Sequence, residues 1–376
     1  MANRERYLEW RLEIIMYDYL IVGAGLYGSI LAYRLKKAGK RVLVIDKRPQ
    51  VGGNMYCEEV EGIQIHKYGP HIFHTSNKRV WDFVNSLVSF NSFRYCPLAS
   101  YKGRLYHLPF NMNTFYELWG TRTPDEARYK IMEGRKEIVG EPSNLEEQAI
   151  SLVGREVYEK LVKCYTEKQW GRDCKDLPAF IIKRLPLRFR FDNNYYDDCY
   201  QGIPDGGGYN ALFVALLDGV ETRTGVNYFD NRDYFNSLAE KIIYCGPIDE
   251  FFDFRFGPLE YRGLRFEEEI LDKESFQGNV AVNYTDHDHP FTRIIEHKYF
   301  GRGDQPKTVI TREFPQEWKP GLEPFYPVND KKNNDKYQNY KSLADSLGNV
   351  SFRGRLAEYK YYDMHTVVEL ALDEEL

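Results

Sequence analysis

The sequence lacks several features that would place it in other protein classes. No apolar run approaches the roughly 18 residues that a membrane-spanning helix needs. Residues 1–15 are charged and lack the apolar core of a secretory signal, and a strong strand opens directly at Met16. We therefore expect the natural start at Met16 and a protein without a membrane span.

Paired cysteines are also missing. The chain has six cysteines, they are scattered, and none forms a CxxC pair. Reduced thiols in a cytoplasmic protein are the simplest explanation for this usage. The cysteines are Cys57, Cys96, Cys164, Cys174, Cys199 and Cys245.

An excess of positive charge is absent as well. The net charge is -5 and the pI is near 6.0, which argues against a protein that binds nucleic acid through its phosphate backbone. The 376 residues are 43% hydrophobic, which is typical of a globular protein long enough for more than one domain. This balance leaves room for a local basic pocket that binds one small anionic ligand.

A glycine-rich turn is the first informative feature that is present. The short apolar run 17–22 predicts a buried parallel strand, and the GxGxxG spacing of Gly23, Gly25 and Gly28 follows at once. A helix is predicted from about 27 to 38, and a second buried strand at 41–45 ends in Asp46. A lone GxGxxG often only closes a turn, but strand, glycines, helix, strand and acid in this order predict a dinucleotide site.

Each of these residue types has a physical reason. Gly23 permits the tight turn, Gly25 lets the backbone approach a pyrophosphate, and Gly28 lets the helix pack on the strand. The helix N-terminus offers free N–H groups and a partial positive charge to the phosphates. Asp46 lies close to the position, about 20 residues downstream, where a carboxylate binds the ribose hydroxyls.

The residues after Asp46 favour FAD over NAD. Lys47 and the pair Gly52-Gly53, followed by Asn54, resemble the extended motif of glutathione-reductase-like FAD enzymes, although a glycine turn between strands would read the same way. The sequence contains no second GxGxxG that would hold a nicotinamide.

The rest of the chain alternates between helical and strand patterns. Strands are predicted at 95–110 with a turn at Lys102-Gly103, at 279–284, 292–300, 307–314 and 349–352, and a strand end at 244–247 rejoins the first sheet. Helices are predicted after Thr123, after Asn144 and from about Asp363. The helix after Asn144 carries a core-facing stripe of Leu145, Ile150, Val153, Val157 and Leu161.

These elements predict an α/β fold in three parts. The first is a glutathione-reductase-like, Rossmann-like FAD-binding domain formed by 16–88, 199–245 and 335–376. The second is an inserted α-helical domain, 110–180, with a loop at about 170–185. The third is an antiparallel β-sheet domain formed by 89–109, 181–198 and 246–334.

Four later segments resemble the UDP-galactopyranose mutase family. They are Tyr68-Gly69-Pro70-His71-Ile72-Phe73-His74-Thr75, then Tyr165-Thr166-Glu167-Lys168-Gln169-Trp170-Gly171 with Lys183-Arg184-Leu185-Pro186, then 292–300, and finally Gly354-Arg355-Leu356 with Tyr361-Tyr362-Asp363-Met364. Together with the glycine loop they span nearly the whole chain.

The resemblance implies an isomerase that interconverts UDP-galactopyranose and UDP-galactofuranose without net redox change. Reduced FAD is expected to attack the anomeric carbon through N5 and to displace UDP, which returns after the sugar ring recloses. The resemblance also implies a cytoplasmic enzyme that supplies galactofuranose for cell-surface polysaccharide, with a homodimer as one expected assembly.

The resemblance further implies the site residues. Arg184 and Arg293 would clamp the diphosphate, and His74 joins them as a catalytic residue beside the flavin. Closure of the 170–185 loop would carry Arg184 inward. The substrate-binding set is Tyr165, Thr166, Trp170, Arg184, Tyr195, Asn283, Arg293, Tyr326 and Tyr361. The cofactor-binding set is Gly23, Gly25, Tyr27, Gly28, Asp46, Lys47, Gly53, Asn54, His71, Ile72, Arg355, Tyr362, Asp363 and Met364.

Two features fit the resemblance less simply. Tyr95-Cys96 stands where the family commonly has an asparagine of the substrate site, so sugar contacts on that side are expected to differ. His287 and His289 form His-x-His, but no further ligands cluster near them in the sequence, so we expect loop residues and no metal site.

Three alternatives remain open at this point. Another flavoenzyme, such as an amine oxidase or a desaturase, would share the dinucleotide start but has no reason to carry the paired arginines. A non-catalytic carrier like the GDP-dissociation inhibitors would lack an intact glycine-loop site. A related mutase that uses another sugar nucleotide is separable only by assay.

Overall fold

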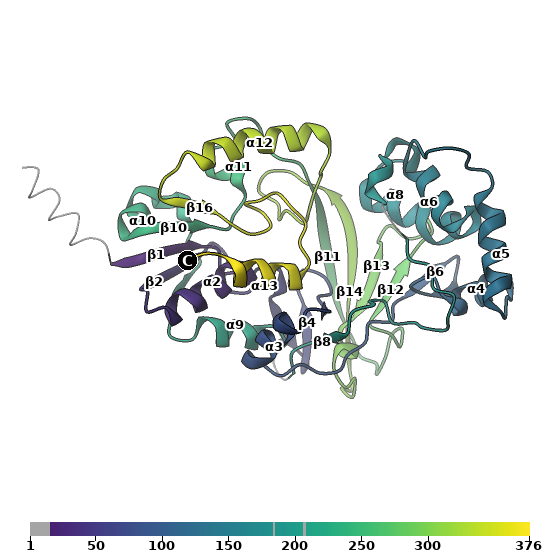
Figure 1. Ribbon diagram of the computed structural model, residues 1–376. Coiled ribbons are helices and arrows are strands. Elements are labelled where there is room, and N and C mark those ends of the chain that lie inside the picture. Colours follow the sequence, from purple (N-terminus) through teal and green to yellow (C-terminus); the bar gives the residue numbers. More distant parts are fainter. Residues whose placement is uncertain (1–15, 183–184, 206–207) are drawn as a thin grey trace, which may run out of the picture.

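The structure is a computed structural model that describes residues 16–182, 185–205 and 208–376. Figure 1 shows a lobe built around a parallel sheet at one end and a lobe of helices at the other, with long antiparallel strands between them. The first strand and the last helix both lie in the parallel-sheet lobe, so the chain leaves this lobe and returns to it.

The parallel sheet has the strand order β16-β10-β1-β2-β9. Its strands are β1 (Tyr17–Val22), β2 (Val42–Asp46), β9 (Glu221–Thr224), β10 (Ala239–Tyr244) and β16 (Val350–Phe352). The predicted return of the chain near residue 244 is confirmed, because Ile243 of β10 pairs with Ile21 of β1. A sheet covered on both faces needs continuous apolar strands, and β1 and β2 supply them.

Helices cover both faces of this sheet. Ile21 packs in a core with α2 (Leu26–Lys37), α9 (Asn210–Leu217) and α13 (Met364–Asp373). Leu20, its neighbour on the strand, packs in a second core with α10 (Arg232–Leu238), α11 (Ile248–Phe251) and α12 (Lys331–Asp345). Successive side chains of a strand point to opposite faces, so β1 contributes to both cores.

The antiparallel sheet has the strand order β15-β11-β14-β13-β12-β6-β7. Its strands are β6 (Leu98–Tyr101), β7 (Arg104–His107), β11 (Tyr261–Leu271), β12 (Ala281–Tyr284), β13 (Arg293–Glu296), β14 (Thr308–Glu317) and β15 (Tyr326–Pro327). The predicted turn at Lys102-Gly103 is confirmed, and both residues have positive φ, as a tight hairpin turn requires.

Strand β13 ends earlier than predicted. We expected a strand over 292–300, but β13 stops at Glu296 and His297–Phe300 form a 3-10 turn. The fully buried Glu296 carboxylate accepts hydrogen bonds from three consecutive backbone N–H groups, at residues 276–278. Buried Lys298 donates to three carbonyls of neighbouring loops. Because Glu296 and Lys298 bind neighbouring loops in this way, the chain leaves the sheet after Glu296.

Two small antiparallel strand pairs complete the parallel-sheet lobe. β3 (Cys57–Val60) pairs with β4 (Ile63–His66), and β5 (Phe73–Thr75) pairs with β8 (Tyr200–Gly202). Helix α3 (Lys78–Leu87) follows β5 and is capped by Asn77. The β5–β8 pair places His74 opposite Gln201, although 126 residues of sequence lie between them.

The helical lobe contains α4 (Met112–Trp119), α5 (Pro124–Arg135), α6 (Leu145–Val153), α7 (Arg155–Val157) and α8 (Cys164–Trp170). The predicted start after Thr123 is confirmed: Thr123 caps α5, and Glu126 returns a hydrogen bond to the backbone of Thr123. Asn144 caps α6 through the N–H of Glu147.

The helix after Asn144 does not run continuously to Leu161. It breaks at Gly154, whose φ is +80°. A Cβ at this glycine would lie 3.2 Å from Cα of Gly134 in α5, so the break permits the two backbones to touch. The predicted apolar stripe is nevertheless buried in the core of this lobe.

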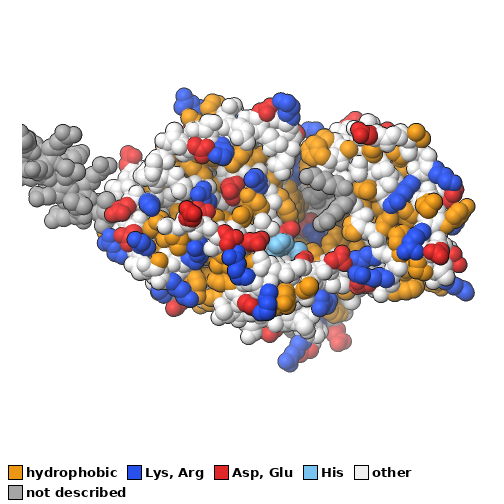
Figure 2. Space-filling view, viewed as in Figure 1, with side chains coloured by type: hydrophobic (Ala, Val, Ile, Leu, Met, Phe, Trp, Pro, Cys, Tyr) orange, Lys and Arg blue, Asp and Glu red, His pale blue; other side chains and the backbone are white. Residues whose placement is uncertain are grey.

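In the described ranges, no helix combines the length and the apolar character needed to cross a membrane. Figure 2 shows the surface hollowed between the two lobes, with histidine exposed on the floor of the hollow.

Candidate active site

The glycine loop after β1 forms a cradle with an open side. Gly23 has φ +114°, a conformation that favours glycine, and a Cβ at Gly28 would lie 2.1 Å from the carbonyl oxygen of Gly23. In contrast, a Cβ at Gly25 would meet nothing within 4 Å. Gly25 is also the N-cap of α2, where N–H groups are free. The loop therefore leaves room for an anion at the helix N-terminus, as the predicted dinucleotide site requires.

Asp46 holds the loop in this shape. Its carboxylate accepts hydrogen bonds from the backbone N–H of Ala24 at 2.7 Å and of Arg48 at 2.8 Å. Each carboxylate oxygen has a second lone pair, so Asp46 can still accept a hydrogen bond from a ribose hydroxyl. The acid thus both supports the loop and remains available to a ligand.

A further basic residue, Arg48, lines the cleft beside the predicted Lys47. Lys47 lines the cleft but is half exposed and lies 3.8 Å from Glu250. Arg48 stacks over the Tyr68 ring and donates to Asn54. Its Nη1 is buried and has no hydrogen-bond partner among the described residues. A buried guanidinium N–H without a partner is costly, so this atom points to a missing polar ligand.

The cleft continues from the glycine loop to the C-terminal segment. All predicted cofactor residues line it except Ile72 and Asp363, which are chain neighbours of the lining residues His71 and Met364. The sequence did not predict another part of the cleft lining, which comes mainly from the two loops after β9 and β10. The missed lining residues include Val226, Asn227, Tyr228, Phe229, Cys245, Gly246, Pro247, Glu250, Glu323 and Pro324. Loops at the carboxyl ends of parallel strands are the signal that could have found the residues after β9 and β10. Glu323 and Pro324 come from the segment between β14 and β15, which this signal does not mark.

His71 lies in this cleft as a neutral base. Burial lowers its pKa to about 4. Its Nδ1 lies 2.8 Å from the carbonyl oxygen of Gly69, which can only accept, so Nδ1 carries the proton. Its backbone N–H donates to Nδ1 of buried His66. The Nε2 of His71 is thereby left as an acceptor for a ligand.

Arg293 is the buried cation of a second site, on the antiparallel sheet. Its Nη2 binds both carboxylate oxygens of Glu313, at 3.0 and 2.7 Å. Glu313 lies opposite on β14 and is only 1% exposed. Arg293 Nε is buried and finds no partner in the described part of the chain. The guanidinium is fixed on one edge and free on another, which suits an anion clamp.

Tyrosines from separate segments surround Arg293. Burial raises the pKa of Tyr165 and of Tyr195, while the positive charge of Arg293 opposes the rise in both. Tyr326 and Tyr361 also lie near Arg293, with ring centroids 5.8 Å apart, and Arg293 lowers the pKa of each against the effect of burial. The structure thus brings four predicted substrate residues to one cation. Tyr195 and Tyr361 are 42% and 55% exposed, so both remain open to a ligand.

Tyr95 occupies the same surroundings. It is 5% exposed, its ring centroid lies 5.5 Å from that of Tyr195, and Arg293 opposes the burial-induced rise of its pKa. The departure noted in the sequence therefore places an aromatic ring against the predicted arginine clamp. Asn283 pairs with Arg293 across β12 and β13, and its Oδ1 is buried without a partner in the described ranges.

Helix α8 presents the remaining described substrate residues. Thr166 is buried and Trp170 is partly buried at the end of the helix. Gly171 then ends α8 in a left-handed conformation. Arg184 lies outside the described residues, so its predicted place at the diphosphate stays a prediction. The described part of the predicted loop contains two short 3-10 turns, Cys174–Asp176 and Ala179–Ile181.

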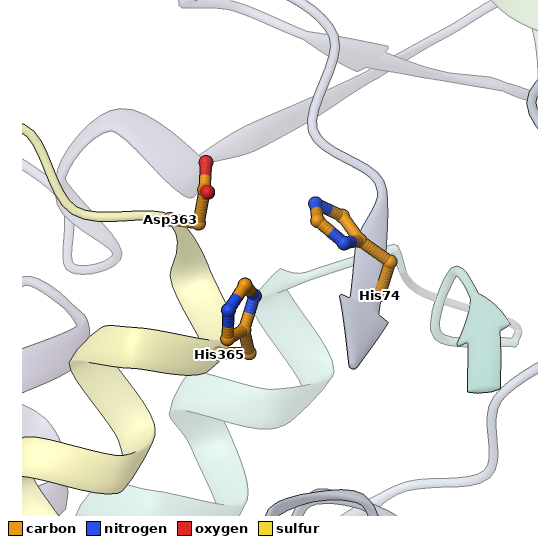
Figure 3. Close-up of side chains that lie close together, drawn as sticks. All are labelled: His74, Asp363 and His365. Carbon is orange, nitrogen blue, oxygen red and sulfur yellow. The ribbon is translucent and has the colours of Figure 1, made fainter. Parts of the chain in front are cut away.

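His74 lies in a polar cluster beside the cofactor cleft. Figure 3 shows its ring near Asp363 and His365, from the start of α13, and their ligand atoms lie within 4.8 Å of one another. His74 Nδ1 lies 2.6 Å from Asp198, and its ring stacks on Tyr196 at 3.7 Å. The expectation of no metal site stays a prediction here.

In space, Cys164 and Glu167 lie beside His287, although no further ligand type lies near the His-x-His pair in the sequence. The reason is that α8 packs across the loop after β12, where Lys168 donates to three carbonyls. His287 Nε2 lies 3.3 Å from Glu167. Burial raises the pKa of Cys164, which keeps its thiol protonated and a weak metal ligand.

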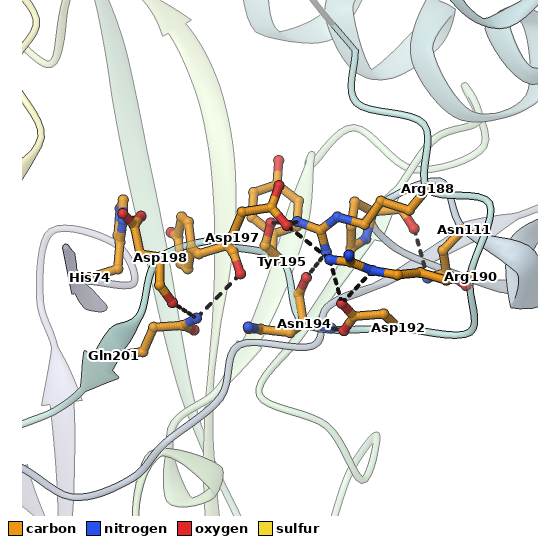
Figure 4. Close-up of polar contacts among 12 residues, drawn as sticks. His74, Asn111, Arg188, Arg190, Asp192, Asn194, Tyr195, Asp197, Asp198 and Gln201 are labelled. Atoms are coloured by element: carbon orange, nitrogen blue, oxygen red, sulfur yellow. Dashed lines mark hydrogen bonds and ion pairs between the residues drawn. The ribbon is translucent and has the colours of Figure 1, made fainter. Parts of the chain in front are cut away.

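A segment without helix or strand, residues 192–198, crosses between the two sites. We call it the strap. The strap carries Tyr195. At its end, the Asp198 carboxylate forms a hydrogen bond with Nδ1 of His74 and accepts another from the Ser76 hydroxyl. Figure 4 shows the strap with Arg188 and Arg190 at its other side. Tyr195 is also tied by its backbone N–H to the carbonyl of Tyr95 at 2.7 Å.

Comparison with known families gives matches over most of the chain. Residues 160–361 match the family described as UDP-galactopyranose mutase, and residues 21–87 match the NAD(P)-binding Rossmann-like domain. The first match covers more than half of the sequence.

Individual relatives match the chain almost end to end. A protein named dTDP-fucopyranose mutase, from Escherichia coli, is 37% identical over 95% of this chain and 97% of its own length. A protein named probable UDP-galactopyranose mutase, from Klebsiella pneumoniae, is 37% identical over 94% of this chain and 93% of its own length. A crystal structure of reduced UDP-galactopyranose mutase aligns with a TM-score of 0.71, covering 96% of this chain and 93% of that one. At 14% identity this last likeness shows the fold alone.

Proposed function

Since this chain belongs to the UDP-galactopyranose mutase family and is an enzyme of the isomerase class, we propose that it interconverts UDP-galactopyranose and UDP-galactofuranose. The observation that carries the proposal is the juxtaposition of two sites. His71, which lines the dinucleotide cleft, is close enough to Arg293 for that charge to lower its pKa, and Arg355 of the same cleft lies within electrostatic range of Tyr326 and Tyr361.

The cofactor of the proposal is FAD. The open space at Gly25, the available acceptors of Asp46 and the Nη1 of Arg48, which has no partner among the described residues, fit a dinucleotide. We assign its binding to the predicted cofactor set, with Arg48 and the loops after β9 and β10 added. In its reduced form this cofactor supplies the nucleophile for the anomeric carbon of the sugar.

The residues of this chain then have separate tasks. Arg293, held by Glu313, would bind the diphosphate before and after the glycosidic bond breaks. Tyr165, Tyr195, Tyr326 and Tyr361 would surround it and offer hydroxyl donors. Arg184 would complete the clamp from the segment before the strap. His74, with Nδ1 bonded to Asp198, would offer Nε2 to the sugar or the cofactor.

Four finer features belong to the same proposal. They are the three-part domain division, closure of the 170–185 segment, a cytoplasmic location and assembly as a homodimer. The location is supported by six free cysteines. Size-exclusion chromatography with light scattering will test the assembly.

A second candidate substrate is dTDP-fucopyranose. The Escherichia coli relative with that name matches this chain at the same 37% identity as the Klebsiella pneumoniae one. Tyr95, where the family commonly has asparagine, lies against Arg293 and changes the wall of the site.

The test supplies dithionite-reduced protein with UDP-galactofuranose and with dTDP-fucofuranose in separate reactions and follows the pyranose products by HPLC. A kcat/KM at least about tenfold higher for the UDP sugar, equal to about 1.4 kcal/mol, supports the first candidate. The reverse ratio would transfer the proposal to the second. No conversion of either sugar by a protein that retains its flavin would reject both.

A further inference from the structure

We propose that Arg188 is a positioning residue that sets the shape of the strap and thereby holds Tyr195 at the diphosphate site. This inference rests on the proposed function, because Tyr195 matters only if a nucleotide sugar binds at Arg293.

The strap has little structure of its own. Residues 192–198 contain no helix or strand, so their backbone shape depends on contacts from outside. Arg188 supplies several of these contacts. Its Nη1 donates to the carbonyl of Asn194, and its Nη2 donates to the carbonyl of Tyr195 at 3.1 Å. Nη2 also lies 2.9 Å from the Asp197 carboxylate (Figure 4).

These contacts fit the geometry of an arginine. Its planar guanidinium presents N–H groups in a fixed fork, which can reach two consecutive carbonyls at once. A guanidinium in the protein interior requires partners for its charge and its donors. The Arg188 side chain is 7% exposed, and its three partners all lie on the strap.

Arg188 is itself anchored to the buried Phe110, in the segment between β7 and α4. Its backbone N–H donates to the carbonyl of Phe110 at 2.9 Å, and Leu187 forms a parallel bridge with Phe110. The strap is therefore held relative to a fixed part of the molecule and not only to itself.

Tyr195 is the strap residue that faces the diphosphate site. Burial raises the pKa of its hydroxyl, while the positive charges of both Arg293 and Arg188 oppose that rise, so the hydroxyl lies within electrostatic range of both. Without the fork of Arg188, the strap must be ordered each time a ligand binds. That ordering weakens ligand affinity, because the entropy is then lost during binding and not during folding.

Arg190, which also binds the strap from outside it, provides a matched control. Its guanidinium binds Asp192 and Asp197, yet its side chain is 64% exposed, against 7% for Arg188. Exposed ion pairs contribute little, because water and salt screen them. Loss of Arg190 should therefore remove charge from the strap without changing its shape.

The experiment measures UDP affinity by isothermal titration, with holoprotein of wild type, R188M, R188K and R190M. For R188M we expect the Kd of UDP to rise about tenfold or more, since two hydrogen bonds that order the binding residue are lost. For R188K we expect partial recovery, because an ammonium keeps the charge but cannot span both carbonyls. R190M should stay within about twofold. Flavin content should be equal in all four proteins.

A double-mutant cycle with Tyr195→Ala separates positioning from general damage. If Arg188 acts through Tyr195, R188M should change the Kd of UDP by less than about threefold in the Y195A background. Equal losses in both backgrounds, or an R188K protein that loses flavin while its remaining holoprotein binds UDP normally, would overturn the inference. A wild type that fails to bind UDP would instead overturn the proposed function. If wild type and R188M bind UDP equally, only the role of Arg188 is rejected.

Discussion

The cofactor cleft and the Arg293 site are built in opposite ways. The cleft is shaped largely by backbone: the glycine loop leaves space at Gly25, and the first turn of α2 offers its N–H groups. The Arg293 site is built from side chains that come from α8, β13, β14, β15 and the strap. A site formed by the backbone of one loop is encoded in a short stretch of sequence. A site formed by side chains from several elements depends on how distant segments pack together.

The largest expected effect separates two glycines of the cleft. Gly28→Ala places a Cβ 2.1 Å from the carbonyl oxygen of Gly23, so we expect loss of both fold and flavin. Gly25→Ala meets no atom of the described residues within 4 Å, so we expect a folded protein that has lost its flavin because the methyl group occupies phosphate space. Circular dichroism melts and visible flavin absorbance measure the two properties. A G25A protein with full flavin content would contradict the backbone account of the cleft.

The next effect concerns the anchored arginine. Glu313→Gln removes the buried charge partner of Arg293. We expect kcat/KM to fall about a hundredfold, equal to about 2.7 kcal/mol, because a buried charge loses its partner. Flavin content should stay normal, since the cleft does not use Glu313.

A matched pair on the same sheet serves as the control. Glu269 binds Arg312 across β11 and β14, but its side chain is 45% exposed. Glu269→Gln should therefore leave kcat/KM within about twofold. If both glutamine variants lose activity equally, the loss reflects damage to the sheet and not the anchoring of Arg293.

A pH effect on stability should come from the buried histidines. Burial lowers the pKa of His71 to about 4 and of His297 to about 3, from the ordinary value of 6.5. Below about pH 6.5 these histidines become protonated in the unfolded chain but stay neutral in the folded chain. Stability is therefore complete above that pH and falls as the pH drops toward 4, by up to about 1.4 kcal/mol per pH unit for each histidine.

Thermal melts of the holoprotein between pH 7.5 and 5 measure this slope, in a range chosen to cross the ordinary histidine pKa of about 6.5. His297→Gln, which can keep a bond to Thr311, should reduce the slope. A melting temperature that does not fall with acidification would show that these histidines become protonated without cost.

The smallest effect lies far from both sites. Thr123→Ala removes the N-cap of α5 and should destabilise the protein by about 1 kcal/mol. Neither flavin content nor KM should change, because α5 contributes no residue to the cofactor cleft. A changed KM would show that the helical lobe is coupled to the Arg293 site more tightly than the contacts indicate.

The sequence predicts what depends on neighbours along the chain. The glycine loop, the Thr123 cap and the turn at Lys102-Gly103 are local patterns, and the structure confirms the loop's geometry and the other two elements. Gly154 was missed because a glycine breaks a helix here for a tertiary reason, namely its contact with Gly134.

The second site could be predicted only through family resemblance. The Arg293 partner, Glu313, lies 20 residues away and meets it by strand pairing. Tyr95 and the fork of Arg188 depend equally on packing between segments. No local periodicity marks such contacts, because sheet register and chain crossings decide them.

The most direct test of the account is conversion of UDP-galactofuranose to UDP-galactopyranose by the purified flavoprotein, with and without dithionite. The account predicts that only the reduced protein converts the substrate. It also predicts that Arg293→Ala abolishes the conversion while the flavin content is retained. Equal conversion by the oxidised and the reduced protein, or full activity in R293A, would contradict it.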